Sequence, residues 1–222
     1  MRHRPAPHRD PLTQGNGVVT TIAVIDHGAG NLVSIAQGLA ASGVDVRIVD
    51  EPAGLTPCDG VVLPGVGATA PAMERLDRAG LVEPLRRWEL PLLGICVGLQ
   101  VFFDSSEEDG ARCLGIVPGA VRRLDDRQRL PHIGWNDVAT NDDALFDGVA
   151  TGTPFYFVHS YAPAPADPTV VIGTADYGQP FAAAVRSKNR VGVQFHPERS
   201  GPAGLKVLAN FVAACREDAR AA

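Results

Sequence analysis

The first hundred residues alternate between short apolar runs and helical patterns, with glycine-containing turns between them. The runs expected to be strands are residues 18–26, 44–50, the start of 60–68 and 91–96, and the expected helices are 31–42, closed by Gly43, then 71–88 and 97–106. Such alternation predicts a parallel α/β sheet with helices on both faces. Right-handed crossovers would place the loops that follow the strands along one edge, where ligands of such folds bind.

The second half of the chain has a different pattern, with short β-prone segments separated by turns. These segments are 116–124, 132–139, 155–161, 169–175, 181–185 and 191–195. They predict antiparallel strands added to the sheet, followed by a last helix at about 203–216. The proline-rich tract at 162–168 is interpreted as a stiff surface loop that connects two segments. The fold class is therefore α/β, with a mixed, mostly parallel central sheet flanked by helices.

A chain of 222 residues is long enough for one domain with an extensive core. We expect that domain to cover residues 18–222, after a disordered extension at 1–17 that lacks the apolar stretch of a secretory signal. The net charge of −5 gives no electrostatic reason to expect nucleic acid binding, and no apolar run is long enough to span a membrane.

Four cysteines are widely spaced at 58, 96, 113 and 215, without a C-x-x-C pair that would suggest zinc or a redox dithiol. We therefore predict a cytoplasmic protein with free thiols, no metal and no cofactor. Three of these cysteines are expected to be structural, and Cys96 lies in a different context.

Cys96 is the centre of a G-I-C-V-G segment at 94–98. Small residues on both sides allow a strand to turn sharply into a helix, and this arrangement exposes a nucleophile at the turn. Free N–H groups at the helix start favour a thiolate, and the N–H of Val97 could donate to an oxyanion. The alternative is a small, buried structural cysteine at the end of a strand.

The segment V-G-V-Q-F-H-P-E at 191–198 supplies a base for this cysteine. Residues two apart in an extended chain point the same way, so Glu198 can reach the imidazole of His196. A carboxylate on one ring nitrogen sets the tautomer and leaves the other nitrogen to take the thiol proton. The pattern predicts a Cys96–His196–Glu198 triad.

The glycine-rich segment L-P-G-V-G at 63–67 follows an expected strand. Its glycines allow the backbone to lie close against a ligand. We expect Gly65 and Val66 to provide the second oxyanion donor, although an ordinary turn is the alternative.

Together these three segments resemble the class I, triad-type glutamine amidotransferases. Further segments look like the glutaminase subunits of imidazole glycerol phosphate synthases, which belong to histidine biosynthesis. They are G-A-G-N at 28–31, P-G-V-G-A at 64–68, S-S-E-E at 105–108, P-H-I-G-W-N at 131–136, F-V-H-S-Y at 157–161 and H-P-E-R-S-G at 196–201. The resemblance covers residues 20 to 215, and it implies the flavodoxin-like fold of that family.

The resemblance implies that Cys96 forms a glutamyl thioester and releases ammonia, and that water then frees glutamate. Ammonia would pass through a channel in a barrel-shaped cyclase subunit, the partner in a heterodimer, to a ribulosyl aminoimidazole carboxamide nucleotide. The residues that this implies for glutamine binding are Gly65, Gln100 and the backbone around His159, Ser160 and Tyr161.

The resemblance also implies activation by the occupied cyclase site, for which we expect a peptide flip at 64–67. The residues implied at the subunit interface are Asn31, Trp135, Tyr156 and Arg199. For the two aromatic residues, ordinary packing is the alternative. Arg199 stands where the family often has lysine, which changes a point charge into a planar fork, and Ala29 stands where it often has proline.

Two other functions remain open at this point. The chain could be a class I amidotransferase that serves pyridoxal phosphate, anthranilate or purine synthesis, which would share the triad but not readily the other segments. It could also be a non-catalytic regulatory homologue, although such proteins usually lose the nucleophile.

Overall fold

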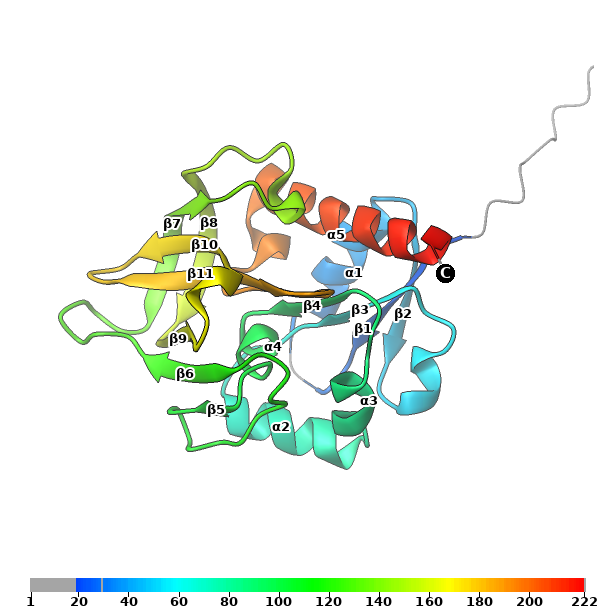
Figure 1. Ribbon diagram of the computed structural model, residues 1–222, viewed down its shortest axis with the longest axis horizontal. Coiled ribbons are helices and arrows are strands. Elements are labelled where there is room, and N and C mark those ends of the chain that lie inside the picture. Colours follow the sequence, from blue (N-terminus) through cyan, green and yellow to red (C-terminus); the bar gives the residue numbers. More distant parts are fainter. Residues whose placement is uncertain (1–18, 29, 222) are drawn as a thin grey trace, which may run out of the picture.

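The computed structural model describes residues 19–28 and 30–221, and nine strands form one mixed sheet through its centre (Figure 1). The strand order is β2-β1-β3-β4-β12-β11-β10-β7-β8. The strands are β1 (Thr21–Ile25), β2 (Asp45–Val49), β3 (Gly60–Leu63), β4 (Leu92–Ile95), β12 (Arg190–Val193), β11 (Pro180–Ser187), β10 (Val171–Asp176), β7 (His132–Thr140) and β8 (Thr153–His159). The first five strands in this order are parallel, and each of the remaining four runs antiparallel to its neighbour.

Helices cover both faces of the parallel part (Figure 1). Helices α1 (Leu32–Ala40) and α5 (Gly201–Ala221) lie on one face, and α2 (Thr69–Arg78) and α3 (Val82–Arg86) lie on the other. Every residue of β1, β3 and β4 is buried, as expected for strands that helices cover on both sides. Four short 3₁₀ turns complete the connections: η1 (Pro52–Leu55), η2 (Ala144–Phe146), η3 (Pro168–Val170) and η4 (Pro197–Arg199).

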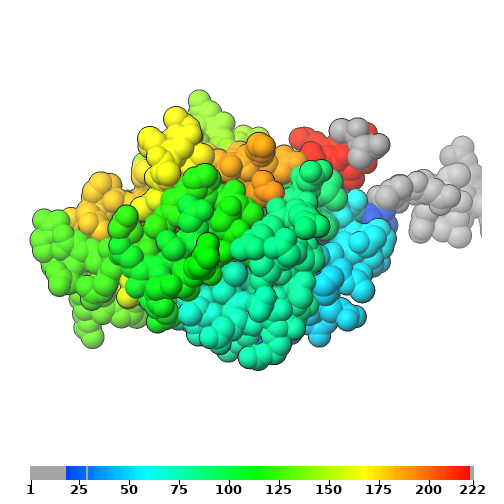
Figure 2. All heavy atoms as spheres, turned by 60° about the horizontal axis from the view of Figure 1, so that its bottom comes forward, coloured from blue at the N-terminus to red at the C-terminus, as the bar shows by residue number. Residues whose placement is uncertain are grey.

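A second sheet of three strands has the order β5-β6-β9, with β5 (Ser105–Ser106), β6 (Gly119–Arg123) and β9 (Tyr161–Pro165). Figure 2 brings the lower face of Figure 1 forward, and it shows the chain around residues 100–125 packed beside the α2 and α3 region. The prediction of a surface loop at 162–168 is wrong, because residues 162–165 belong to strand β9. Prolines fit there because β9 is an edge strand that pairs with β6 alone in this sheet, so the missing N–H groups face outward.

Three other expectations need correction. The helix expected at 97–106 is only one turn, α4 (Val97–Gln100), because the buried residues Phe102 and Phe103 turn the chain into the core toward β5. The pattern at 71–88 forms two helices, since Gly80, with φ +70°, follows the end of α2. The segment at 191–195 was expected among the antiparallel additions, but β12 pairs in parallel with β4.

The predicted fold class is confirmed, and β1 begins close to the expected start at Val18. The single-domain assignment to 18–222 stays a prediction. The extension at 1–17 that was predicted to be disordered, Val18 itself and Ala29 lie outside the described residues. No described helix combines the length and the apolar character that a membrane crossing requires.

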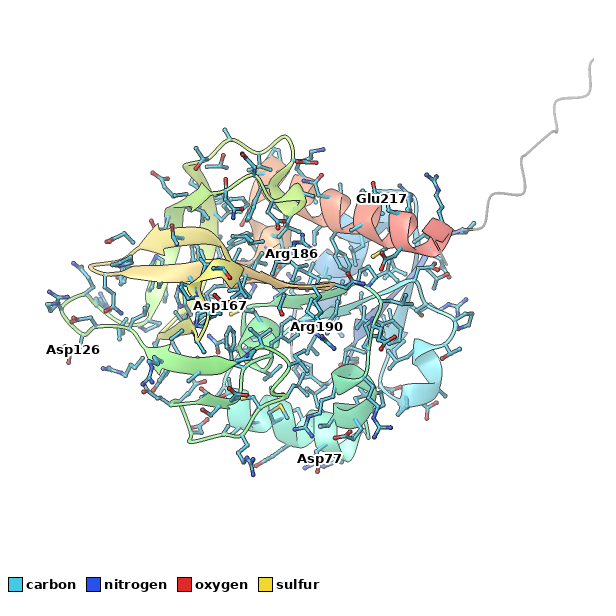
Figure 3. All side chains as sticks on the ribbon, in the orientation of Figure 1. Asp77, Asp126, Asp167, Arg186, Arg190 and Glu217 are labelled. Carbon is cyan, nitrogen blue, oxygen red and sulfur yellow. The ribbon has the colours of Figure 1, made fainter. Side chains whose placement is uncertain are left out.

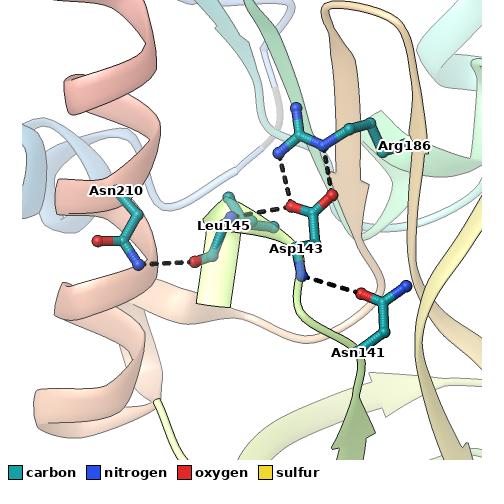
Figure 4. Close-up of polar contacts among 5 residues, drawn as sticks. All are labelled: Asn141, Asp143, Leu145, Arg186 and Asn210. Atoms are coloured by element: carbon teal, nitrogen blue, oxygen red, sulfur yellow. Dashed lines mark hydrogen bonds and ion pairs between the residues drawn. The ribbon is translucent and has the colours of Figure 1, made fainter. Parts of the chain in front are cut away.

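Polar contacts tie α5 to the sheet at the edge opposite the carboxyl ends of the parallel strands. Figure 3 shows Arg186 and Arg190 in this region. The Arg186 guanidinium donates two hydrogen bonds to Asp143, at 2.6 and 2.7 Å, and Asn210 on α5 donates to the Leu145 carbonyl at 2.9 Å (Figure 4). These paired groups anchor the helix and lie outside the pocket described next.

Candidate active site

Cys96 occupies the turn between β4 and α4, with φ +54° and ψ −111°. A non-glycine residue with positive φ is uncommon, and such strain is found at functional sites. The Cys96 N–H donates to the Val193 carbonyl at 2.8 Å, which ties the turn to β12. A Cβ on Gly98 would overlap the Leu63 carbonyl oxygen, so the close approach of β3 to the turn requires glycine at that position. Because α4 has four residues, its dipole is weaker than the sequence suggested.

His196 and Glu198 lie side by side after β12. Nδ1 of His196 is 2.9 Å from Oε1 of Glu198, and the two side chains are 4% and 1% exposed. The backbone holds this pair on both sides. The His196 N–H donates to the Tyr156 carbonyl at 2.9 Å, and the Ser200 hydroxyl donates to the His196 carbonyl at 2.6 Å. The carboxylate therefore accepts the Nδ1 proton, which directs Nε2 outward as the basic nitrogen.

The electrostatics of this pair favour a charged imidazole. Burial lowers the pKa of His196, but the neighbouring Cys96 sulfur and the Glu198 carboxylate outweigh burial and raise that pKa well above its ordinary value. Nε2 has no hydrogen-bond partner within the described part of the chain, and it lines the same pocket as Cys96. An imidazolium beside Cys96 stabilises the thiolate, which is the nucleophilic form.

Gln194, which received no role from the sequence, contacts the sulfur. Its Nε2 donates to Cys96 Sγ at 3.5 Å, and its side chain is fully buried. Gln100 donates to the Gln194 oxygen at 3.0 Å, which orients the Gln194 amide with its N–H₂ group toward the sulfur. A signal existed in the sequence, because Gln194 is a polar residue in an apolar strand, two residues before His196.

A pocket opens in front of Cys96. The residues that line it are Val66, Gly67, Cys96, Val97, Gln100, Glu108, Val158, His159, Ser160, Tyr161 and His196. Every residue expected to bind glutamine lines this pocket except Gly65, which is buried behind it. Gln100 also donates to the Tyr161 carbonyl at 2.9 Å, so one side chain links two walls.

Glu108 is the second residue that the sequence did not single out. It comes from the S-S-E-E segment, and its carboxylate accepts the Thr69 N–H at 3.1 Å while lining the pocket. Burial and the nearby Asp109 raise the pKa of Glu108, against the hydrogen bond from Thr69, which lowers it. A partly desolvated carboxylate at the pocket wall is a ready partner for a cationic ligand group.

Two buried histidines are bonded to each other beside the pocket, and one of them, His159, lines it. His159 Nδ1 lies 2.8 Å from the Tyr161 carbonyl, and its Nε2 lies 3.1 Å from Nδ1 of His132. Since a carbonyl only accepts, His159 carries its proton on Nδ1 and accepts from His132 on Nε2. Burial lowers the pKa of His132 to about 4 and that of His159 to about 3. Both rings are therefore neutral, and they hold the Tyr161 carbonyl in place.

The candidate oxyanion donors meet at the same turn. No backbone hydrogen bond among the described residues uses the Val97 N–H, which is free for a ligand. A Cβ on Gly65 would lie 2.8 Å from Val97 Cβ, so Gly65 packs directly against the turn. Val66 is 42% exposed, and a Cβ on Gly67 would meet no atom within 4 Å, so the second half of the segment is loosely packed.

The four residues expected at a subunit interface lie outside the pocket. Trp135 and Tyr156 are cross-strand neighbours on β7 and β8, with ring centroids 6.2 Å apart, and Trp135 is 57% exposed. The Arg199 guanidinium lies 4.2 Å over the Tyr156 ring. Asn31 is the N-cap of α1 and accepts from the Ser34 N–H at 3.4 Å. Tyr156 is linked to the pocket, because its backbone carbonyl accepts a hydrogen bond from the N–H of His196.

The chain is similar to known proteins over most of its length. The chain is 48% identical over 195 residues to the imidazole glycerol phosphate synthase subunit HisH of Moorella thermoacetica, covering 86% of this chain and 93% of that one. It is 46% identical over 198 residues to the same-named subunit of Xanthomonas axonopodis pv. citri, covering 87% and 98%. A solved structure of a glutamine amidotransferase superposes with a TM-score of 0.70 at 17% identity, over 88% of this chain and 98% of that one.

The family model for class-I glutamine amidotransferases matches residues 23–215, from within β1 to within α5. With the match covering most of the chain, this protein belongs to the class-I glutamine amidotransferase family.

Proposed function

We propose that this chain is the glutaminase subunit of an imidazole glycerol phosphate synthase, which hydrolyses glutamine and delivers ammonia to a cyclase subunit. The observation that carries the proposal is the buried His196–Glu198 pair at 2.9 Å, set beside the strained Cys96 in one pocket. The high identity to proteins named as HisH subunits selects this member of the family over the pyridoxal phosphate, anthranilate and purine alternatives. The intact triad argues against a non-catalytic homologue.

In the proposed reaction, the Cys96 thiolate attacks the side-chain amide carbon of glutamine. The oxyanion that forms accepts hydrogen bonds from the Val97 N–H and from the segment containing Gly65 and Val66. The His196 imidazolium then gives its proton to the amide nitrogen, the C–N bond breaks, and ammonia leaves a glutamyl thioester. Water attacks the thioester with His196 as base, which releases glutamate and restores the thiolate.

Glutamine recognition would use the pocket walls. The Glu108 carboxylate is the natural partner of the α-ammonium group, since opposite charges pair most strongly where water is partly excluded. Gln100 presents its side chain to the same end. The backbone at His159, Ser160 and Tyr161 would hold the α-carboxylate, with the neutral histidine pair fixing the Tyr161 carbonyl.

The proposed partner is a barrel-shaped cyclase that forms a heterodimer with this chain in the cytoplasm. Free ammonia is mostly protonated near neutral pH and is then no nucleophile, so a sheltered channel between the subunits preserves it. The face with Trp135, Tyr156, Arg199 and Asn31 is the proposed docking surface, because Trp135 is exposed there and Tyr156 is bonded to the catalytic histidine. Free thiols are the expected state of the four cysteines at this location.

The decisive experiment is Cys96→Ala in the complex with the cyclase subunit of the same organism. Glutamine-dependent synthesis should fall to background, while synthesis from added ammonium salt should continue at the wild-type rate. Cys113→Ala is the matched control, because Cys113 is also buried but lies outside the pocket. Glutamine hydrolysis that survived Cys96→Ala would disprove the nucleophile, and failure to form a one-to-one complex would disprove the partner.

The proposed activation is tested in the same complex. Rotation of a peptide within 64–67 would supply the second oxyanion donor when the cyclase site is filled, and Gly65 and Gly67 allow it. Glutaminase activity should rise strongly when the cyclase ligand is added. An equal rate with and without that ligand would contradict the switch.

A further inference from the structure

A buried histidine outside the triad is bonded to the segment expected to supply the second oxyanion donor. His27 follows β1, and its Nε2 lies 2.7 Å from the Pro64 carbonyl oxygen, 37 residues away in sequence. The side chain is buried, at 5% exposure. A carbonyl only accepts, so His27 carries its proton on Nε2 and donates it to Pro64.

The other ring nitrogen of His27 makes a buried histidine at this position unfavourable for the stability of the fold. Nδ1 of His27 is buried and has no hydrogen-bond partner among the residues that the structure describes. An unpaired buried acceptor destabilises a folded protein, and a phenyl ring would fill a similar volume without one. Packing alone therefore does not account for histidine at this position, and the bond to Pro64 is the feature that a phenyl ring could not provide.

That bond also restrains the segment expected to supply the oxyanion donor, residues 64–67, which is called the oxyanion strand below. Pro64 and Gly65 are buried, whereas Val66 and Gly67 are exposed. Within the described ranges, the backbone of residues 64–67 makes no other hydrogen bond. Beyond that bond, packing holds the start of the segment, because Gly65 lies against the turn at Cys96 and Pro64 lies beside Gly30.

The geometry of one peptide unit connects His27 to the oxyanion hole. The Pro64 carbonyl and the Gly65 N–H belong to the same planar trans peptide and point in opposite directions. Holding the carbonyl toward His27 therefore fixes the direction of the Gly65 N–H. A Cβ on Gly65 would lie 2.7 Å from the Gly98 nitrogen, so this residue has no room to shift sideways. The peptides that follow can still rotate, and the first of them carries the Val66 N–H.

We infer that His27 is a positioning residue that anchors the base of the oxyanion strand, so that the donor from Gly65 or Val66 meets the oxyanion together with Val97. The inference rests on the proposed glutaminase function and adds a residue to its machinery. His27 does not touch glutamine. It acts through Pro64, and its effect belongs to the transition state, where the oxyanion exists.

The test is His27→Phe in the full chain, assayed as the complex with the cyclase subunit and its ligand. Complete loss of one oxyanion donor lowers kcat by about 10²–10³-fold, and a misplaced donor should cost less, about tenfold. KM for glutamine should change by less than about twofold, since the anchor acts after binding. His27→Gln keeps an N–H donor at a similar reach, and it should restore kcat to within about threefold of wild type.

A second readout separates positioning from general damage. Alkylation of Cys96 by iodoacetamide displaces iodide from a saturated carbon and forms no oxyanion, so its rate should be unchanged in His27→Phe. Peptide mass spectrometry assigns the modified cysteine, because three others are present. Equal slowing of alkylation and hydrolysis would overturn the inference in favour of a structural role. A kcat within twofold of wild type in His27→Phe would overturn it as well.

Two further outcomes are distinguishable. A wild-type complex that does not hydrolyse glutamine would refute the proposed function itself. If His27→Phe does not fold, the tautomer of His27 in the wild-type protein tests the inference instead. Long-range ¹H–¹⁵N spectra report which ring nitrogen carries the proton. The Nε2–H tautomer supports the anchor, and the Nδ1–H tautomer removes its donor and overturns it.

Discussion

Replacing Glu198 by glutamine should slow glutamine hydrolysis by about 30- to 1,000-fold. The carboxylate faces an imidazole that is positive when it protonates the leaving nitrogen and becomes positive again when it accepts the proton of water, with Nδ1 and Oε1 2.9 Å apart. Two unit charges with centres about 4 Å apart interact by about 4 kcal/mol at an effective dielectric constant near 20. Glutamine retains a hydrogen-bonding group but not the charge, so about 2–4 kcal/mol of transition-state stabilisation is lost, and each 1.36 kcal/mol is a factor of ten.

The side-chain exposures of 4% and 1% leave little room for salt to screen this loss. The assay is the initial rate of glutamate release by the ligand-activated complex, with kcat and KM measured separately. KM should stay within about threefold, because Glu198 does not line the glutamine pocket. Glu217→Gln is the matched control, since it removes the same charge from an exposed position on α5 (Figure 3) and should leave the rate unchanged. A Glu198→Gln rate within threefold of wild type would refute the reasoning.

Glu198→Gln should also change how the free energy of unfolding depends on pH. The folded pKa of His196 is raised, so its imidazolium contributes stability that is fully present below the unfolded pKa of about 6.5 and is lost as pH rises through the folded pKa. Glu198→Gln moves the folded pKa back toward its ordinary value. Urea unfolding should therefore show the largest loss of stability near pH 6 and a smaller one near pH 9. An equal loss at both values would contradict the charge pairing.

Three further predictions concern stability. Arg186→Met should lower the free energy of unfolding by about 2 kcal/mol in urea at pH 7, because it leaves the Asp143 carboxylate without its ion-pair partner. Glutaminase activity should not change, since this pair lies outside the pocket. An unchanged free energy of unfolding would show that the bidentate bonds are unimportant. His132→Phe should flatten the pH dependence of stability. The folded pKa of about 4 means that wild type loses stability as pH falls from about 6.5 to about 4, and an unflattened curve in urea titrations would argue against a neutral ring. Gly98→Ala should lower the unfolding free energy by about 3 kcal/mol and abolish hydrolysis, because its Cβ would overlap the Leu63 carbonyl; a normal thermal midpoint would contradict the close approach.

Local patterns in the chain were sufficient for much of the fold. Apolar runs with glycine turns identified β1, β3 and β4, because strands buried on both faces need continuous apolar residues. Errors arose where partners distant in sequence decide the local conformation. The residues around Phe102 are apolar enough for a helix, but burial against the core turns them aside. The prolines of β9 look like a loop until β6 lies beside them on one side only.

The sequence by itself determined the identities and local order of the chemical groups. A cysteine between glycines and an H-P-E unit predict a nucleophile, a base and an orienting carboxylate, since the two-residue spacing of His196 and Glu198 is a local property of an extended chain. Only the tertiary structure decided which groups surround them. The N–H···S contact of Gln194, the carboxylate of Glu108 at the pocket wall and the bond from His27 to Pro64 join residues 37 to 98 positions apart. Such contacts depend on how the strands and turns pack, because no local periodicity records the distance between segments that meet only in the folded chain.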